Sequence, residues 1–167
     1  MELIHESVLY AISTPVYLLV IGLEMVFSHF HHLRFYSLKG TFTNFYLMLF
    51  NMGIDLLMRG FSLAVLDICF NHAFIHFTEP VIYWILLLFA QDLMFYILHV
   101  ADHYIRIFWA VHVTHHSSEE FNLTVGFRSS VFQPVYRFLY FIPLAFAGFK
   151  GIDIIFMYSA TQIYENH

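Results

Sequence analysis

The chain has 167 residues, of which 60% are hydrophobic, 20% are aromatic and only 11% are charged. Soluble domains carry about 25% charged residues, so this composition excludes an ordinary soluble protein and indicates a membrane protein of one domain. The formal net charge of −5 gives no argument for nucleic-acid binding. The single cysteine, Cys69, excludes a disulfide within the chain.

The first apolar segment, residues 7–27, has the roughly 20 residues that a helix needs to cross the hydrocarbon core of a bilayer. Pro15 is tolerated in a membrane helix, and Glu24 is interpreted as a boundary residue whose carboxylate reaches the interface. The N-terminal sequence MELIHESV lacks the basic region of a signal peptide, so we expect this helix to be retained as an anchor. Residues 28–42 contain basic residues and no acidic residue, which predicts a cytoplasmic loop with interfacial histidines.

Residues 43–70 are a longer apolar stretch, which predicts either one tilted membrane helix or two shorter ones. Gly53 and Gly60 are the weak points at which such a helix would break. Asp55 and Arg59 are four residues apart, so on a helix they can form an ion pair.

The next loop, residues 71–80, contains no lysine or arginine and is therefore predicted to lie on the non-cytoplasmic side. His72 and His76 form an HxxxH pair within it. We interpret this pair as interfacial rather than metal-binding, because the loop is predicted to lie across the membrane from the main histidine cluster.

Residues 81–100 predict a third span whose helix continues through His103 into the cytosol. Eighteen positions at its end hold five histidines, namely His99, His103, His112, His115 and His116. Residues three or four apart lie on one face of a helix. The first two histidines could therefore bind one metal ion, and His112 could bind another together with His115 or His116. Neutral imidazole is the commonest protein ligand for iron, zinc, copper and nickel.

Two carboxylates lie on the same predicted helix as the first histidines. Asp92 shares a face with His99 and His103, and it could accept the second ring N–H of a ligand or make a structural hydrogen bond. Asp102 is expected to point away from that face and to be solvated.

Residues 131–149 predict a fourth span with kinks at Pro134 and Pro143, and a further apolar segment runs from residue 152 to His167. That last segment is short for a complete membrane helix, so we expect the chain to be a fragment or a truncated product. His167 is expected to arrive on the same side as the five clustered histidines. The predicted fold is all-α: a polytopic membrane helical domain of four to five spans with a cytosolic histidine-rich cap.

The tract HVADHYIRIFWAVHVTHHSSEEFNLTVGFRSS resembles the fatty acid hydroxylase/sterol desaturase superfamily. Members of that superfamily carry HRxxH, then WxxHxxHH, then a third histidine-rich region. The matching residues here are His99, His103, Trp109, His112, His115 and His116. The SSEEFNLTVGFRSS tract is similar to that of the alkylglycerol monooxygenase-like and bacterial sterol desaturase-like branch, and IGLEMVFSHFHHLRFYSLKGTFTN resembles the first span and following loop of the same branch. This sequence departs from the pattern at Val100, where the family has arginine, in GFRSS in place of ALRQS, and in lacking the third region.

The resemblance implies a single membrane-embedded domain over residues 1–167, incomplete at the C-terminus, that oxidises a C–H bond of a lipid with O2. The resemblance implies two bound iron ions, and zinc is another ion that the same ligands accept. Tetrahydrobiopterin is implied only by the resemblance to the alkylglycerol monooxygenase-like branch. The implied ligands are His99, His103, His112, His115 and His116, with His167 as a sixth, and Asp92 and Asn122 are expected around them. The expected partners are the membrane, a lipid of the ether-lipid or sterol-like kind and an electron donor. The expected location is the endoplasmic reticulum if the source is eukaryotic and the inner membrane if it is bacterial.

Two other interpretations stay open. A non-enzymatic metal-binding or metal-transporting protein would place histidines at mid-membrane in several spans, whereas here they follow the third span at its boundary. A truncated, inactive relative is favoured for this chain by the absence of the third histidine region.

Overall fold

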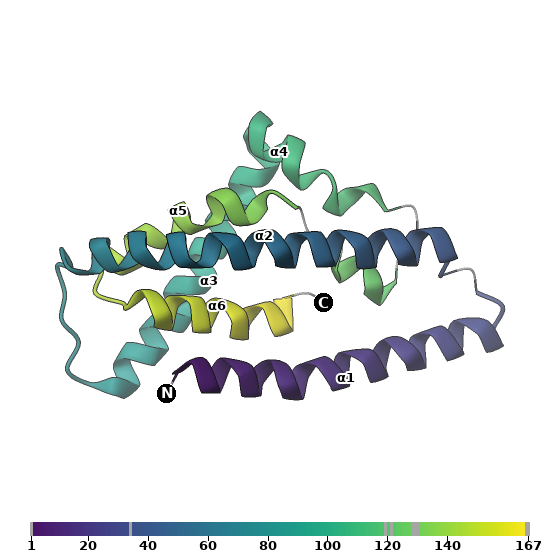
Figure 1. Cartoon of the computed structure of the whole chain (residues 1–167), viewed down its shortest axis with the longest axis horizontal. Coiled ribbons are helices and arrows are strands. Elements are labelled where there is room, and N and C mark those ends of the chain that lie inside the picture. Colours follow the sequence, from purple (N-terminus) through teal and green to yellow (C-terminus); the bar gives the residue numbers. More distant parts are fainter. Residues whose placement is uncertain (1, 34, 119, 121, 128–130, 166–167) are drawn as a thin grey trace.

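A computed structural model describes residues 2–33, 35–118, 120, 122–127 and 131–165, and within these residues every element is helical (Figure 1). The α-helices are α1 (Glu2–Phe30), α2 (Leu38–Phe70), α3 (Pro80–Tyr104), α4 (Arg106–His112), α5 (Gln133–Phe146) and α6 (Gly151–Glu165). Two short 3-10 helices, η1 (His115–Ser117) and η2 (Leu123–Phe127), follow α4. The all-α prediction is confirmed. Helix α2 lies along α5 and α6, and α3 crosses them obliquely. Helix α1 lies on the opposite side of α6 from α2 (Figure 1).

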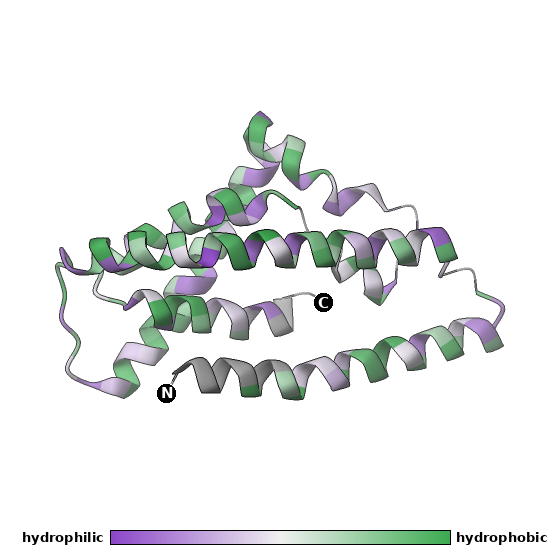
Figure 2. Ribbon diagram, in the orientation of Figure 1, coloured by the Kyte–Doolittle hydropathy of each residue, from purple (hydrophilic) through white to green (hydrophobic). Residues whose placement is uncertain are grey.

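Two of the described helices are long and apolar enough to cross a membrane: α1 over residues Ala11–Phe30, and the whole of α3. Over residues 11–30, most apolar side chains of α1 are exposed, including Leu19 and Leu23, and apolar residues recur along the coloured part of this helix (Figure 2). An exposed apolar surface of this kind fits contact with lipid chains.

The described helices do not establish the predicted four to five spans. Helix α5 has 14 residues, fewer than the roughly 20 that a helix needs to span a bilayer. Residues 43–70 lie within the single continuous helix α2, so no break occurs at Gly53 or Gly60.

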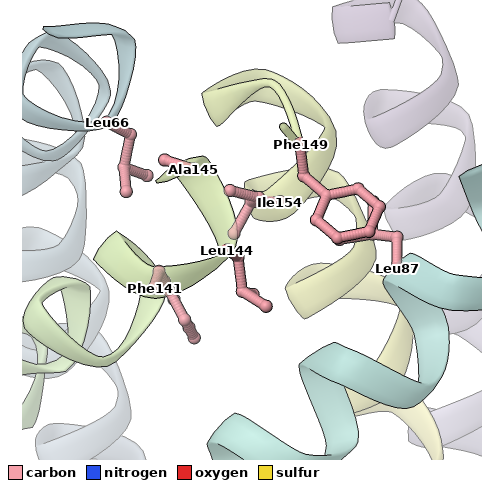
Figure 3. Packing of buried hydrophobic residues seen from close by; sticks show 7 residues of the cluster. All are labelled: Leu66, Leu87, Phe141, Leu144, Ala145, Phe149 and Ile154. Atoms are coloured by element: carbon pink, nitrogen blue, oxygen red, sulfur yellow. The ribbon is translucent and has the colours of Figure 1, made fainter. Parts of the chain in front are cut away.

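The buried core lies where α2, α3, α5 and α6 meet (Figure 3). Its members are Leu66 of α2, Leu87 of α3, Phe141, Leu144 and Ala145 of α5, Phe149, and Ile154 of α6. Because α5 contributes three of these side chains, it is held against α3. This packing places the first turns of α5 beside the C-terminal end of α3.

The turn between α5 and α6 closes against the loop that precedes α3. Gly148 has a φ of +101°, and a Cβ at this position would lie 2.1 Å from the carbonyl oxygen of Ile75, so only glycine fits. The backbone N–H of Phe74 donates to the carbonyl of Phe146 at 2.8 Å. The loop 71–79 is thereby fixed at the start of α3, and the 25 residues of α3 place its other end roughly 37 Å away.

The ion pair that holds Asp55 joins two helices. Arg137 of α5 contacts the Asp55 carboxylate, donates to the hydroxyl of Tyr158 at 2.6 Å and lies 4.1 Å above the centre of the Tyr158 ring. The sequence pattern predicted an ion pair between Asp55 and Arg59, one turn along α2, and it did not point to Arg137. Packing of α5 on α2 brings the Arg137 guanidinium to Asp55 from another helix, where it makes several contacts at once.

Candidate metal centre

Three of the predicted histidines converge at the junction of α3 and α4. His99 and His103 lie one turn apart near the end of α3, and their Nε2 atoms are 3.2 Å apart. The backbone of Ile105 is extended (φ −96°, ψ 118°), which ends α3 and lets α4 start in a new direction. Helix α4 then carries His112 to the other two, and one ligand atom from each histidine lies within 4.8 Å of the others.

The spacing of these nitrogens suits a transition metal. Metal–nitrogen bonds of about 2.1 Å place two adjacent ligand atoms about 3.0–3.4 Å apart, and the Nε2 atoms of His99 and His103 are 3.2 Å apart. The donors are all imidazoles, which suit iron, zinc, copper and nickel. These residues therefore fit the metal that the sequence resemblance implies.

A second pair of imidazoles adjoins the first three. The Nε2 atoms of His112 and His116 are 3.2 Å apart, and the ring of His116 lies 5.0 Å from that of His103. The ring of His116 lies 5.2 Å from that of His115 and 5.8 Å from that of Trp109, measured between ring centres. All five predicted histidines thus lie in one cluster, although His115 and His116 are outside the group of three that meets ligand distances among the described residues.

Burial favours the neutral form of two of these imidazoles, those of His112 and His116. His112 is buried, and desolvation, followed by the charges of the neighbouring histidines, lowers its pKa to about 4. Burial is also the largest cause of the lowered pKa of His116, with smaller contributions from His115 and His103. A neutral imidazole keeps a lone pair, which is the form that binds a metal.

Asp102 is fully buried beside the cluster, so the expectation that it is solvated is wrong. Its Oδ2 lies 3.4 Å from Nδ1 of His112 and accepts a hydrogen bond from Nε2 of Gln133 at 2.8 Å. Its Oδ1 accepts from the hydroxyl of Tyr136, also at 2.8 Å. Both donors belong to α5, more than 30 positions along the chain, so no local sequence pattern could have found them.

The segment that follows the histidines is tied to α1. Oε2 of Glu24 accepts from the backbone N–H of Leu123 at 2.9 Å and from the hydroxyl of Tyr36. Asn122 donates to the carbonyl of Phe35 at 2.5 Å. Glu24, which the sequence suggested was a boundary residue, is therefore an anchor for η2.

The same segment is also tied to α2. Glu120 accepts from the backbone N–H of Ser37 at 3.0 Å, and Nδ2 of Asn44 donates to the hydroxyl of Thr124 at 2.9 Å. The Thr124 hydroxyl in turn donates to the side chain of Asn122 at 2.6 Å. Glu120, Asn122 and Thr124 thus form a hydrogen-bonded strap between the segment after the histidine cluster and the start of α2.

The remaining predicted residues lie elsewhere or cannot be placed. Asp92 is half-buried on α3, two turns before His99. His167 lies outside the described residues. His72 and His76 are exposed in the loop before α3, and among the described residues they are not part of a group of three potential ligands.

The fold and the cluster together define a candidate metal centre of histidines at the end of an apolar helix. The sequence model described as Fatty acid hydroxylase matches residues 84–167, which is half of the chain and includes the whole cluster. The chain belongs to the fatty acid hydroxylase family, as its histidine motifs indicated. The family uses a di-iron centre.

Several relatives are alkylglycerol monooxygenases. The protein of Xenopus tropicalis is 29% identical over 137 residues, which cover 80% of this chain and 30% of the relative. The human protein is 39% identical over 62 residues, covering 37% of this chain and 14% of the relative, and that of Caenorhabditis elegans is 44% identical over 50 residues, covering 30% and 10%. The chain thus spans 30% or less of the length of these relatives. No solved structure matches it.

Proposed function

We propose that this chain is the histidine-bearing part of a membrane-bound, O2-dependent lipid hydroxylase or desaturase. The observation that carries the proposal is the convergence of His99, His103 and His112 at metal-ligand spacing at the end of an apolar helix. The names of the relatives favour an ether lipid with a glycerol headgroup over a sterol-like lipid as substrate.

Each clustered histidine has a role in this proposal. His99, His103, His112, His115 and His116 hold iron, and His167 is a further candidate ligand. Two iron ions, when bound, supply the activation of O2. Zinc would bind the same imidazoles but has no redox chemistry, so it would leave the protein inactive in oxidation. An electron donor is needed as well, and tetrahydrobiopterin is the candidate that the family branch supplies.

The surroundings of the cluster support a lipid substrate. Ile107 of α4 is 70% exposed and Tyr104, at the end of α3, is 86% exposed, and Trp109 and Val113 add apolar surface beside the histidines. An apolar surface next to the cluster lets a lipid chain approach from the bilayer while the polar cap remains on the cytosolic face. The membrane would be the endoplasmic reticulum in a eukaryote and the inner membrane in a bacterium.

The test is oxidation of a lipid by the protein in nanodiscs. The longest natural protein that contains this chain is loaded with Fe²⁺ and supplied with a 1-O-alkylglycerol, tetrahydrobiopterin and isotopically labelled O2. Mass spectrometry should find the label in the lipid product, and the His103→Ala variant should give none. Stoichiometric iron binding without labelled product from ether or sterol lipids would instead favour a non-enzymatic metal-binding protein.

A further inference from the structure

Asp102 is a carboxylate without exposed surface at the end of α3. Burying an acidic group is costly unless hydrogen bonds or charges compensate it. Tyr136 and Gln133 each donate to it at 2.8 Å, and Nδ1 of His112 faces it at 3.4 Å. None of these three partners carries a permanent positive charge. Hydrogen bonds, rather than a strong ion pair, therefore hold the carboxylate in place.

The two nitrogens of His112 face different groups. Nδ1 faces Asp102, whereas Nε2 lies 3.2 Å from Nε2 of His116 within the cluster. An imidazole whose Nδ1 faces a carboxylate keeps its proton there, which leaves the lone pair on Nε2. The contact of 3.4 Å is longer than an ordinary hydrogen bond, but attraction between the carboxylate and the Nδ1–H favours the same tautomer.

Helix α5 fixes the carboxylate in this place. The ring of Tyr136 stacks on Phe108 of α4, with centroids 4.6 Å apart and planes at 19°. Tyr136 therefore holds Asp102 of α3 and packs on the helix that carries His112. The relative position of the carboxylate and the imidazole is set by one side chain that touches both elements.

We propose that Asp102 is a positioning residue that fixes His112 as an Nε2 metal ligand, with Tyr136 and Gln133 holding it from α5. The inference rests on the proposed metal centre and deepens it by naming three residues other than the histidines. It requires no particular lipid, electron donor or reaction.

The experiment measures binding of Co²⁺, used alone as the probe, to the full chain in detergent micelles. The visible absorption of Co²⁺ reports the number and identity of its ligands, and titration reports affinity. Asp102→Asn keeps the size of the side chain, but its amide can donate to Nδ1 and so drive the proton to Nε2. We expect Asp102→Asn to weaken Co²⁺ binding by about 10- to 100-fold and to change the absorption spectrum.

A matched control comes from a second buried carboxylate. Asp153 of α6 is also buried and accepts from a tyrosine, Tyr83, at 2.5 Å, but Tyr83 lies near the opposite end of α3 from the cluster. Asp153→Asn should leave both the affinity for Co²⁺ and the spectrum at wild-type values. An equal loss of affinity in Asp153→Asn and Asp102→Asn would overturn the proposal, because it would point to a general loss of stability.

A second variant covers the case in which Asp102→Asn does not fold. Tyr136→Phe removes one donor to the carboxylate and keeps the aromatic contact with Phe108, so we expect a smaller loss of affinity with a shifted spectrum. Helical content, measured by circular dichroism, must match the wild type. Wild-type affinity and spectrum in folded Asp102→Asn, or in Tyr136→Phe if the former is unfolded, would refute the positioning role.

The outcome is separable from the proposed function. If Co²⁺ binding depends on Asp102 but the iron-loaded protein oxidises no lipid, the proposed function fails and the positioning role stands. If lipid is oxidised while Asp102→Asn binds Co²⁺ like the wild type, the positioning role fails and the proposed function stands.

Discussion

The chain contains two HxxxH pairs that are identical in spacing and differ in structure. His99 and His103 lie on α3, where one helical turn brings their Nε2 atoms to 3.2 Å. His72 and His76 lie in the irregular loop 71–79, and Nδ1 of His72 is 2.9 Å from the carbonyl oxygen of Ile68. Both side chains of the loop pair are exposed.

The difference shows what a spacing of four residues requires before it becomes a metal site. The residues must be helical, since residues four apart share a face only on a helix. A third ligand must also come from another element, as His112 does from α4. The loop pair meets neither condition among the described residues.

The largest expected effect comes from removing a histidine of the cluster, with a histidine of the loop pair as the control. His103→Ala should abolish metal loading, because it removes one of the three converging ligands, and His115→Ala should do so if the whole cluster binds metal. His76→Ala should retain full loading. Elemental analysis of the protein purified in nanodiscs measures the metal content. Equal metal content in all three variants would show that the cluster is not the binding site.

Acidification should destabilise the metal-free protein through His112 of the cluster. The pKa of His112 is lowered from 6.5 to about 4 in the folded chain, so the unfolded chain binds this proton more readily. The metal-free protein should therefore lose stability as the pH falls from about 6.5 towards 4, and this contribution should be constant above that range. Denaturant unfolding in the presence of a chelator measures the free energy at each pH. His112→Asn should flatten the decline, while an unchanged decline would contradict the assignment.

The strap that supports the cluster should be weakened by Glu24→Gln. Glu24 accepts hydrogen bonds from Leu123 and Tyr36, and loss of its charge should cost about 1–3 kcal/mol of unfolding free energy. Hydrogen exchange of residues 122–127 should accelerate. Glu79→Gln is the matched control, since Glu79 is exposed and makes no side-chain bond to the start of α3. Equal exchange rates in the two variants would rule out the anchoring role.

The smallest expected effect is that of His72→Ala. The change removes one exposed contact with Ile68, so the unfolding free energy should stay within about 0.5 kcal/mol of the wild type. Metal content should be unchanged. A measurable loss of metal would mean that the loop pair contributes ligands, and the contrast between the two pairs would then fail.

The sequence predicted the histidine cluster well because its members are close along the chain. Helical spacing alone placed His99 beside His103, and the short interval to His112 kept the third ligand within reach. The residues around the cluster were less accessible to prediction. Asp102 was expected to be solvated, and the packing of α5 on α3 buries it.

The contact between Asp55 and Arg137 was not predicted, for a similar reason. Arg59 is four residues away and Arg137 is 82 residues away, and local spacing can suggest only the first. The hydrogen bond from Leu123 to Glu24 spans 99 residues, so the role of Glu24 was equally hidden.

The sequence by itself determined that the chain is helical and apolar, and which histidines could bind a metal, because composition and helical periodicity act over short distances. Tertiary structure alone decided which carboxylate faces the cluster and which residues of α5 hold it there. The physical reason is that burial and hydrogen bonding depend on which helices pack together. The break at Ile105 and the packing of α5 on α3 turned a local histidine pair into a centre with a third ligand and a buried carboxylate beside it.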